Sequence, residues 1–321
     1  MQLQQRLSQK QLQAFEQMRY GMFLHFGMST FTEKEYDDGT AAPAVYAPAQ
    51  VDVAQWVETA RLAGMKYAVL TAKHVAGHCL WPSKCTDYTV ANSTDKTDVV
   101  GAFVGECRRQ GIVPCLYYCS WDNHTTLGSR MPFDSVLDDG QKAFASDEYQ
   151  AYMAAQLREL LTWYGKLGMI WIDIPFLLGR ACRTRLYREI TALQPDILVM
   201  MNHGIGDSTN YDTRIAWPSD LIPLESALPT SFGGYQKVRR IEGADYYIPG
   251  EVCDTIGHSW FWRENDTLRS DRELLGMYLV ATERGANFLL DAPPDRSGRI
   301  PQASADALFR LRDNIRRLQA V

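Results

Sequence analysis

The chain has 321 residues, of which 46% are hydrophobic and 22% are charged, and its formal net charge at pH 7 is −5. This composition excludes an intrinsically disordered chain, and an acidic balance without long runs of Lys or Arg argues against nucleic acid as a partner. No stretch of 18 apolar residues and no signal-peptide pattern occurs, so we expect a cytoplasmic protein that has no membrane partner.

The cysteine and histidine spacings give no sign of a bound metal. Seven cysteines occur without a CxxC pair, and free thiols are the simpler interpretation in so large a chain. His74 and His78 stand four residues apart, but a glycine separates them and no acidic third ligand is near. We therefore expect no metal site and no cofactor.

Short apolar runs recur along the chain, and most are followed by a segment of helical periodicity. The runs predict eight strands, at 21–27, 66–73, 112–119, 168–173, 196–202, 220–225, 246–253 and 287–293. The intervening periodicity predicts helices at 51–64, 97–111, 147–165, 183–193, 271–285 and 303–319. Segment 203–262 is rich in Gly, Pro, Ser and Asp, which predicts long loops around the two weakest strands.

The strand pattern decides the fold class. Strands that are apolar throughout are typical of a parallel sheet covered by helices on its outer face. Eight rounds of strand and helix in about 300 residues favour a TIM-like (β/α)8 barrel over an open doubly wound sheet. With no linker or repeat visible, we expect one catalytic barrel domain over 1–321, without a C-terminal β-sandwich.

Polar side chains stand near the end of every predicted strand, where barrel enzymes carry their functional groups. They are His25, Lys73, His74, Tyr117, Tyr118, Asp173, Asn202, His203, Glu225, Glu251 and Asp291. Any one of them could simply mark where a strand leaves the core. A complete ring of them predicts a binding site.

Asp173 is the most informative of these residues. It ends the run MIWID and is followed by another apolar run, so its carboxylate needs partners or a task. Aromatic residues such as Trp81 and Trp171 stand near the same strand ends, as in pockets that bind a sugar ring. A second acid facing Asp173 would make a glycosidase, retaining at about 5–5.5 Å and inverting at about 6.5–9.5 Å.

Five segments, in order, resemble the α-L-fucosidase family of retaining glycoside hydrolases. They are RYGMFLHFGMST (19–30), AQWVETARLAGMKYAVLTAKH (54–74), TDVVGAFVGECRRQG (97–111), QLRELLTWYGKLGMIWID (156–173) and GANFLLDAPPDRSGRI (285–300). Together they span nearly the whole chain. The resemblance implies a double-displacement exo-glycosidase that acts on α-L-fucosides in a small oligosaccharide or glycoside.

The resemblance also implies roles for single residues. Asp173 matches the family's nucleophile. Glu225 is the first choice for the general acid/base and Glu251 the second. The expected substrate contacts are His25, Glu35, Tyr36, His74, Trp81, Tyr118, Trp171 and Asn202.

The sequence departs from the family pattern at three places near these contacts. Phe26 replaces the Trp of the family's His-Trp-Gly. The family's second imidazole after His74 is replaced by Val75, so a contact would be lost unless His78 folds back. An Asn-Asp-Arg segment is replaced by Asn202, His203 and Gly204. A related substrate such as an α-L-galactoside, or a barrel that binds sugar without cleaving it, therefore stays open, and a metal-dependent hydrolase is the remaining alternative. The oligomeric state is not predicted.

Overall fold

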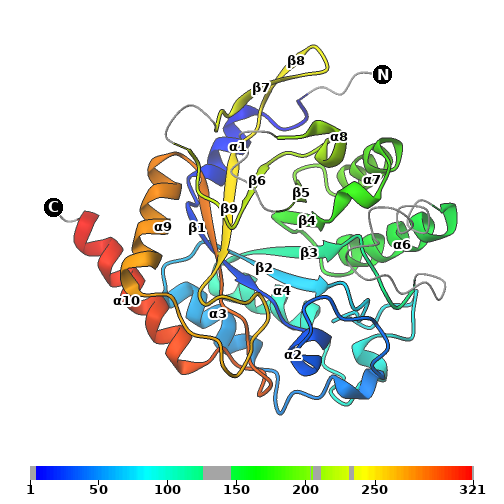
Figure 1. The fold of residues 1–321 in the computed structure, drawn as a ribbon. Coiled ribbons are helices and arrows are strands. Elements are labelled where there is room, and N and C mark those ends of the chain that lie inside the picture. Colours follow the sequence, from blue (N-terminus) through cyan, green and yellow to red (C-terminus); the bar gives the residue numbers. More distant parts are fainter. Residues whose placement is uncertain (1–4, 126–145, 203, 205–210, 231–234, 320–321) are drawn as a thin grey trace.

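A computed structural model describes residues 5–125, 146–202, 204, 211–230 and 235–319 of the chain. Its main sheet has eight parallel strands in the order β5-β4-β3-β2-β1-β10-β9-β6, and it curves round a common axis (Figure 1). These strands are β1 (Tyr20–Leu24), β2 (Tyr67–Lys73), β3 (Val113–Cys119), β4 (Met169–Asp173), β5 (Leu198–Asn202), β6 (Ile222–Glu225), β9 (Gly250–Thr255) and β10 (Asn287–Asp291).

The longer helices between and after the strands cover the outside of this sheet (Figure 1). They are α3 (Val53–Leu62), α4 (Val99–Gln110), α6 (Asp147–Trp163), α7 (Arg180–Leu193), α9 (Asp271–Glu283) and α10 (Gln302–Gln319). The shorter helices are α1 (Gln9–Glu16) before β1, α2 (Met28–Thr32) after β1 and α8 (Thr213–Ala216) before β6. All six predicted helices are confirmed to within three residues at each end. Helix α1 was not predicted, although Ser8 and Gln11 form a capping box at its start.

β5 and β6 are the first and last strands in the sheet order, and the barrel closes where β5 meets the residues that precede β6. The backbone N–H of Asp220 donates to the carbonyl of Val199 (2.8 Å), and its side chain accepts from the N–H of Val199 (2.9 Å). Arg6, from the N-terminal segment, donates to the same carboxylate (2.6 Å). The predicted TIM-like (β/α)8 class is confirmed. The junction between β5 and the residues that precede β6, which we call the barrel seam, is held in part by the side chains of Asp220 and Arg6.

The seventh barrel strand lies later in the chain than predicted. It occupies β9, whereas Tyr246 and Tyr247 belong to a separate antiparallel hairpin of β7 (Val238–Ile241) and β8 (Ala244–Tyr247). Pro249 lies between the two and has no N–H to give to a ladder, so the barrel pairing begins at Gly250, opposite Ile222. Residues 246–248 are apolar because they are largely buried at and just after the hairpin, and this apolar run placed the predicted strand too early.

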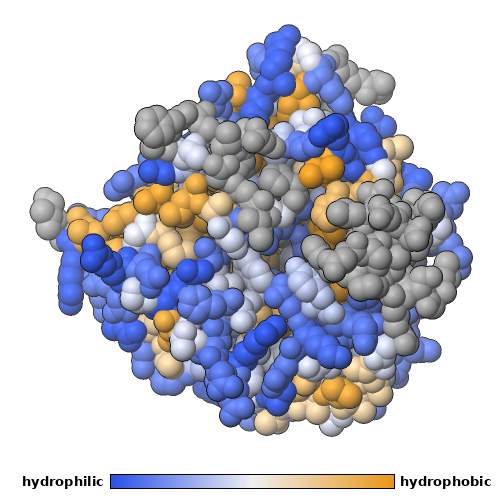
Figure 2. Space-filling model, viewed as in Figure 1, coloured by the Kyte–Doolittle hydropathy of each residue, from blue (hydrophilic) through white to orange (hydrophobic). Residues whose placement is uncertain are grey.

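The barrel interior is filled by side chains of alternate residues on each strand. Gly21 on β1 shows how tightly: a Cβ there would lie 2.5 Å from the ring of Tyr67, which crosses the interior from β2. On the outside, hydrophilic residues cover most of the face shown in Figure 2. The helices therefore present their apolar sides to the sheet and their polar sides to solvent.

Two further findings concern the chain as a whole. All seven cysteines fall within the described residues, and each is a free thiol. Across those same ranges no helix combines the length and hydrophobicity that a membrane crossing requires.

Candidate active site

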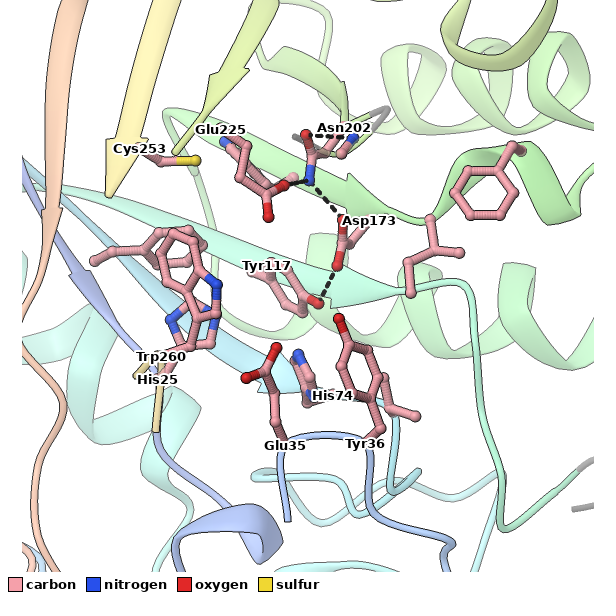
Figure 3. Close-up of a pocket in the computed structure, with 16 residues that line it drawn as sticks. His25, Glu35, Tyr36, His74, Tyr117, Asp173, Asn202, Glu225, Cys253 and Trp260 are labelled. Atoms are coloured by element: carbon pink, nitrogen blue, oxygen red, sulfur yellow. Dashed lines mark hydrogen bonds between the residues drawn. The ribbon is translucent and has the colours of Figure 1, made fainter. Parts of the chain in front are cut away.

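A cavity of about 300 Å³ opens at the carboxyl ends of the strands. Figure 3 shows charged, imidazole and aromatic side chains converging on it from different strands and loops. Its lining consists of Phe23, His25, Glu35, Tyr36, His74, Val75, Tyr117, Trp171, Asp173, Ile174, Phe176, Asn202, Gly204, Glu225, Cys253 and Trp260. This volume suits one sugar ring rather than an extended chain.

Asp173 lies at the end of β4, with hydrogen-bond donors on both of its oxygens. The hydroxyl of Tyr117 donates to Oδ2 (2.6 Å), and the amide nitrogen of Asn202 donates to Oδ1 (2.7 Å). The next residue, Ile174, has a left-handed φ of 53°, which is rare for a β-branched residue. The chain therefore turns sharply after Asp173 and leaves its carboxylate facing the cavity.

Glu225 faces Asp173 through the same amide. The Nδ2 atom of Asn202 also donates to Oε2 of Glu225, at 2.6 Å (Figure 3). The distance from this nitrogen is 2.7 Å to Oδ1 of Asp173 and 2.6 Å to Oε2 of Glu225. These two carboxylate oxygens therefore lie no more than about 5.3 Å apart. An amide NH₂ group has two hydrogens, so both bonds can form at once.

The surroundings of the two acids favour different protonation states. Burial, and after it the nearby charge of Asp173, raise the pKa of Glu225 to about 7. Burial also raises the pKa of Asp173, but its hydrogen bonds from Tyr117 and Asn202 oppose the rise. Because Asp173 receives more donors, a single proton shared by the pair belongs on Glu225.

His25 is held at the end of β1 by a buried carboxylate on the neighbouring strand β10. Its Nδ1 lies 2.9 Å from Oδ1 of Asp291, and its backbone N–H donates to the same oxygen (3.1 Å). An ionised carboxylate only accepts, so Nδ1 carries the proton. The other ring nitrogen is then left for a ligand in the cavity.

His74 follows β2 at a local irregularity. The pairing register with β3 shifts between Thr71 and Lys73, which is the kind of irregularity that re-aims a strand end. Lys73 turns outward into a buried ion pair with Asp122 (2.8 Å), and His74 faces the cavity. Burial, together with His25, lowers the pKa of His74 well below its usual value, so this imidazole is neutral.

Glu35 and Tyr36 enter the cavity from the loop after α2. Burial raises the pKa of Glu35, and a hydrogen bond with the Tyr36 hydroxyl opposes that rise. Tyr36 is 48% exposed, and its ring stacks on the buried ring of Trp121, with centroids 5.8 Å apart. These two predicted contact residues therefore form the side of the cavity that is open to solvent.

Three predicted site residues lie elsewhere. Tyr118 points outward and donates to Gln156 (2.8 Å), while its neighbour Tyr117 reaches Asp173. Side chains alternate along a strand, so the family match was displaced by one residue. Trp81 is buried beneath the loops, where it donates to Glu159 (2.8 Å). Glu251 lies in the barrel interior below the cavity.

The remaining predicted positions, Trp171 and Asn202, line the cavity as described. His78 does not fold back: it is buried and bonded to Ser93 (2.8 Å), and Val75 lines the cavity instead. His203 falls outside the described residues.

Sequence reasoning missed several lining residues. Phe23, Ile174, Phe176, Gly204, Cys253 and Trp260 were not predicted as site residues. Strand periodicity could have found Phe23, two residues before His25. Tyr117 was named among the polar strand ends but was not predicted as a substrate contact, and it lines the cavity. Cys253 ends the predicted strand 246–253, but a thiol at a strand end gives no sign of a site. Nothing in the sequence marks Phe176 or separates Trp260 from the aromatic residues of the core.

Known proteins are similar to this chain over most of its length. The family model described as Alpha-L-fucosidase matches residues 31–314. The chain belongs to the alpha-L-fucosidase family. Among curated relatives of this family, Alpha-L-fucosidase 1 of Arabidopsis thaliana is 30% identical over 302 residues, which cover 89% of this chain and 56% of that protein.

Two solved structures of alpha-L-fucosidases have the same fold. Isoenzyme 1 from Paenibacillus thiaminolyticus is 26% identical with a TM-score of 0.78, covering 96% of this chain and 75% of that one. The Lactobacillus casei enzyme, in complex with its alpha-L-fucose product, is 21% identical with a TM-score of 0.76, covering 97% of this chain and 100% of that one. At this identity the second match concerns the fold alone. The chain spans about half the length of the first curated relatives that it matches.

Proposed function

We propose that the chain is a retaining exo-glycosidase that hydrolyses α-L-fucosides, with Asp173 as nucleophile and Glu225 as general acid/base. The observation that carries this proposal is the amide of Asn202 bonded to both acids. The shared amide brings one oxygen of each acid within about 5.3 Å of the other. So close an approach favours the carboxyl separation of about 5–5.5 Å in retaining enzymes over the inverting range of about 6.5–9.5 Å.

In the first step a carboxylate oxygen of Asp173 attacks the anomeric carbon, and the bond to the leaving group breaks. Glu225 gives its proton to the departing oxygen, which explains why a pKa near 7 is useful. The product of this step is a sugar ester of Asp173. In the second step Glu225 takes a proton from water, which attacks the same carbon and restores the free carboxylate.

The cavity also supports the sugar specificity. His25, Glu35 and His74 offer polar groups to ring hydroxyls, while Phe23, Trp171 and Trp260 offer aromatic surface. A 6-deoxy sugar has both hydroxyls and a methyl group, so it fits such a mixed lining. The family membership and the space for one ring favour release of a terminal fucose.

The test uses aryl α-L-fucosides with good and poor leaving groups. D173A should abolish turnover of both. E225Q should still form the sugar ester quickly from the activated substrate, seen as a burst of released aryl group, because no proton is needed for departure. Its second step should be slow, and with the poor leaving group the first step should be slow as well. Proton NMR of the first-formed sugar should show the α anomer.

Three outcomes would overturn the proposal. They are unchanged turnover in D173A, a β anomer as first product, and fucose binding by calorimetry without hydrolysis. Faster turnover of α-L-galactosides than of α-L-fucosides would keep the mechanism and correct the sugar.

A further inference from the structure

Glu251 is a buried acid that the proposed reaction leaves without a role. It is 0% exposed, in the second position of β9, and both of its oxygens are engaged. Oε1 accepts from the indole Nε1–H of Trp171 (2.9 Å), and Oε2 lies 2.5 Å from the hydroxyl of Tyr67. The side chain thus joins β9 to β4 and β2 through the barrel interior.

Both partners of Glu251 are uncharged, which bears on its protonation. The indole can only donate, so Oε1 must keep a free lone pair. The hydroxyl of Tyr67 can donate or accept, so a protonated Glu251 satisfies both contacts by donating to Tyr67. A buried anion without a cationic partner is costly, and burial raises the pKa of Glu251 to about 7.

Trp171 carries the influence of Glu251 into the cavity. Its ring lines the cavity two residues before Asp173 and packs on Phe23, with centroids 5.3 Å apart. It also stacks on Tyr117 at 6.1 Å. The Nε1–H is the one polar group of the indole, so its hydrogen bond to Glu251 fixes the orientation of the ring in the wall of the cavity.

Building on the proposed function, we propose that Glu251 is a positioning residue that holds the indole of Trp171 against the bound sugar. It exchanges no proton with substrate. Cys253 is the residue of β9 that lines the cavity, and Glu251 lies one layer of side chains deeper. A carboxyl group with both oxygens turned toward Trp171 and Tyr67 has none left for a glycosidic oxygen.

The conservative substitution separates this role from acid catalysis. In E251Q the amide oxygen accepts from Trp171 and the amide N–H donates to Tyr67, so the geometry of the protonated acid is kept. We expect kcat/KM on a poor-leaving-group α-L-fucoside within about threefold of wild type. E251L removes the acceptor and should raise KM about tenfold, with equal losses for good and poor leaving groups.

Y67F is the matched control, because it breaks the other half of the same bridge and Tyr67 does not line the cavity. It should lower the melting temperature and leave KM unchanged. W171F removes the indole N–H and should raise KM as E251L does, and the double variant should be no worse than W171F alone. If E251L fails to fold, the kcat/KM of E251Q and the KM of W171F still test the proposal.

The proposal is overturned if E251Q loses more than about 100-fold at an unchanged melting temperature, since that is the behaviour of a proton donor. It is also overturned if folded E251L keeps the wild-type KM, or if Y67F raises KM as much as E251L. Should the wild type fail to hydrolyse fucosides, the proposed function fails separately. Fucose affinity by calorimetry, weakened in E251L and kept in E251Q, then tests the position of Trp171 by itself.

Discussion

The carboxyl groups of Asp173 and Glu225 are hydrogen-bonded to one and the same amide nitrogen, that of Asn202. The amide keeps two acids close together without a positive charge between them. It therefore leaves their pKa values free to separate by burial and by their other donors.

Removing the amide should harm both steps of the reaction. We expect N202A to lower kcat about 100-fold, the usual effect of losing one donor to a reacting group. N202D should lose more, because it replaces a donor with a third carboxyl group between two acids. Steady-state kinetics on one aryl α-L-fucoside provide the measurement. Near wild-type activity in N202D would contradict the assigned arrangement.

Adjacent tyrosines on β3 offer a matched pair. Y117F removes the hydrogen bond to Asp173, which should raise the pKa of that carboxyl and lower kcat about 10-fold or more. Y118F removes a buried bond to Gln156, so it should cost about 1 kcal/mol of unfolding free energy and leave kinetics unchanged. Equal kinetic losses in the two variants would show that Tyr117 has no special relation to Asp173.

The rate should depend on pH through Glu225. The first step needs its proton, so kcat/KM should fall as the pH rises through about 7. On the acid side the rate should fall as Asp173 becomes protonated, at a pH above the usual aspartate range. E225Q, measured on an activated substrate, should lose the alkaline limb. A limb that persists unchanged in E225Q would have to come from another group.

The same pKa affects stability, with a definite sign. Burial raises the pKa of Glu225 from 4.5 to about 7, so the folded state binds more protons than the unfolded state between these values. The free energy of unfolding therefore falls as the pH rises from about 4.5 to about 7, by at most about 3 kcal/mol for this one group. E225Q should be more stable than wild type at pH 8 and similar at pH 4.5, by urea unfolding. A difference that does not vary with pH would contradict this linkage.

The barrel seam should be sensitive to Arg6. R6A leaves the carboxylate of Asp220 buried beside β5 and without its cation, so the free energy of unfolding should fall by about 3 kcal/mol. K166A is the control, because Lys166 pairs with Asp196 on the exposed surface and should change stability by less than about 1 kcal/mol. Equal effects of the two variants would show that Arg6 does not support the seam.

The sequence by itself determined the fold class and most of the elements. Strands that are buried on both faces carry continuous apolar runs, and helices between them carry a 3.6-residue period, so both can be read locally. It also located Asp173, because a carboxylate inside an apolar run has no local explanation.

Only the tertiary structure decided how the polar strand ends are used. Tyr117 and Tyr118 are equivalent in the sequence, but the pleat sends one to Asp173 and the other to Gln156. Glu225 was the first candidate for a place opposite Asp173 and Glu251 the second, and a difference of depth along neighbouring strands places Glu225 in the cavity and Glu251 below it. Such differences arise from strand register and barrel closure, which join residues far apart in the chain and leave no local pattern.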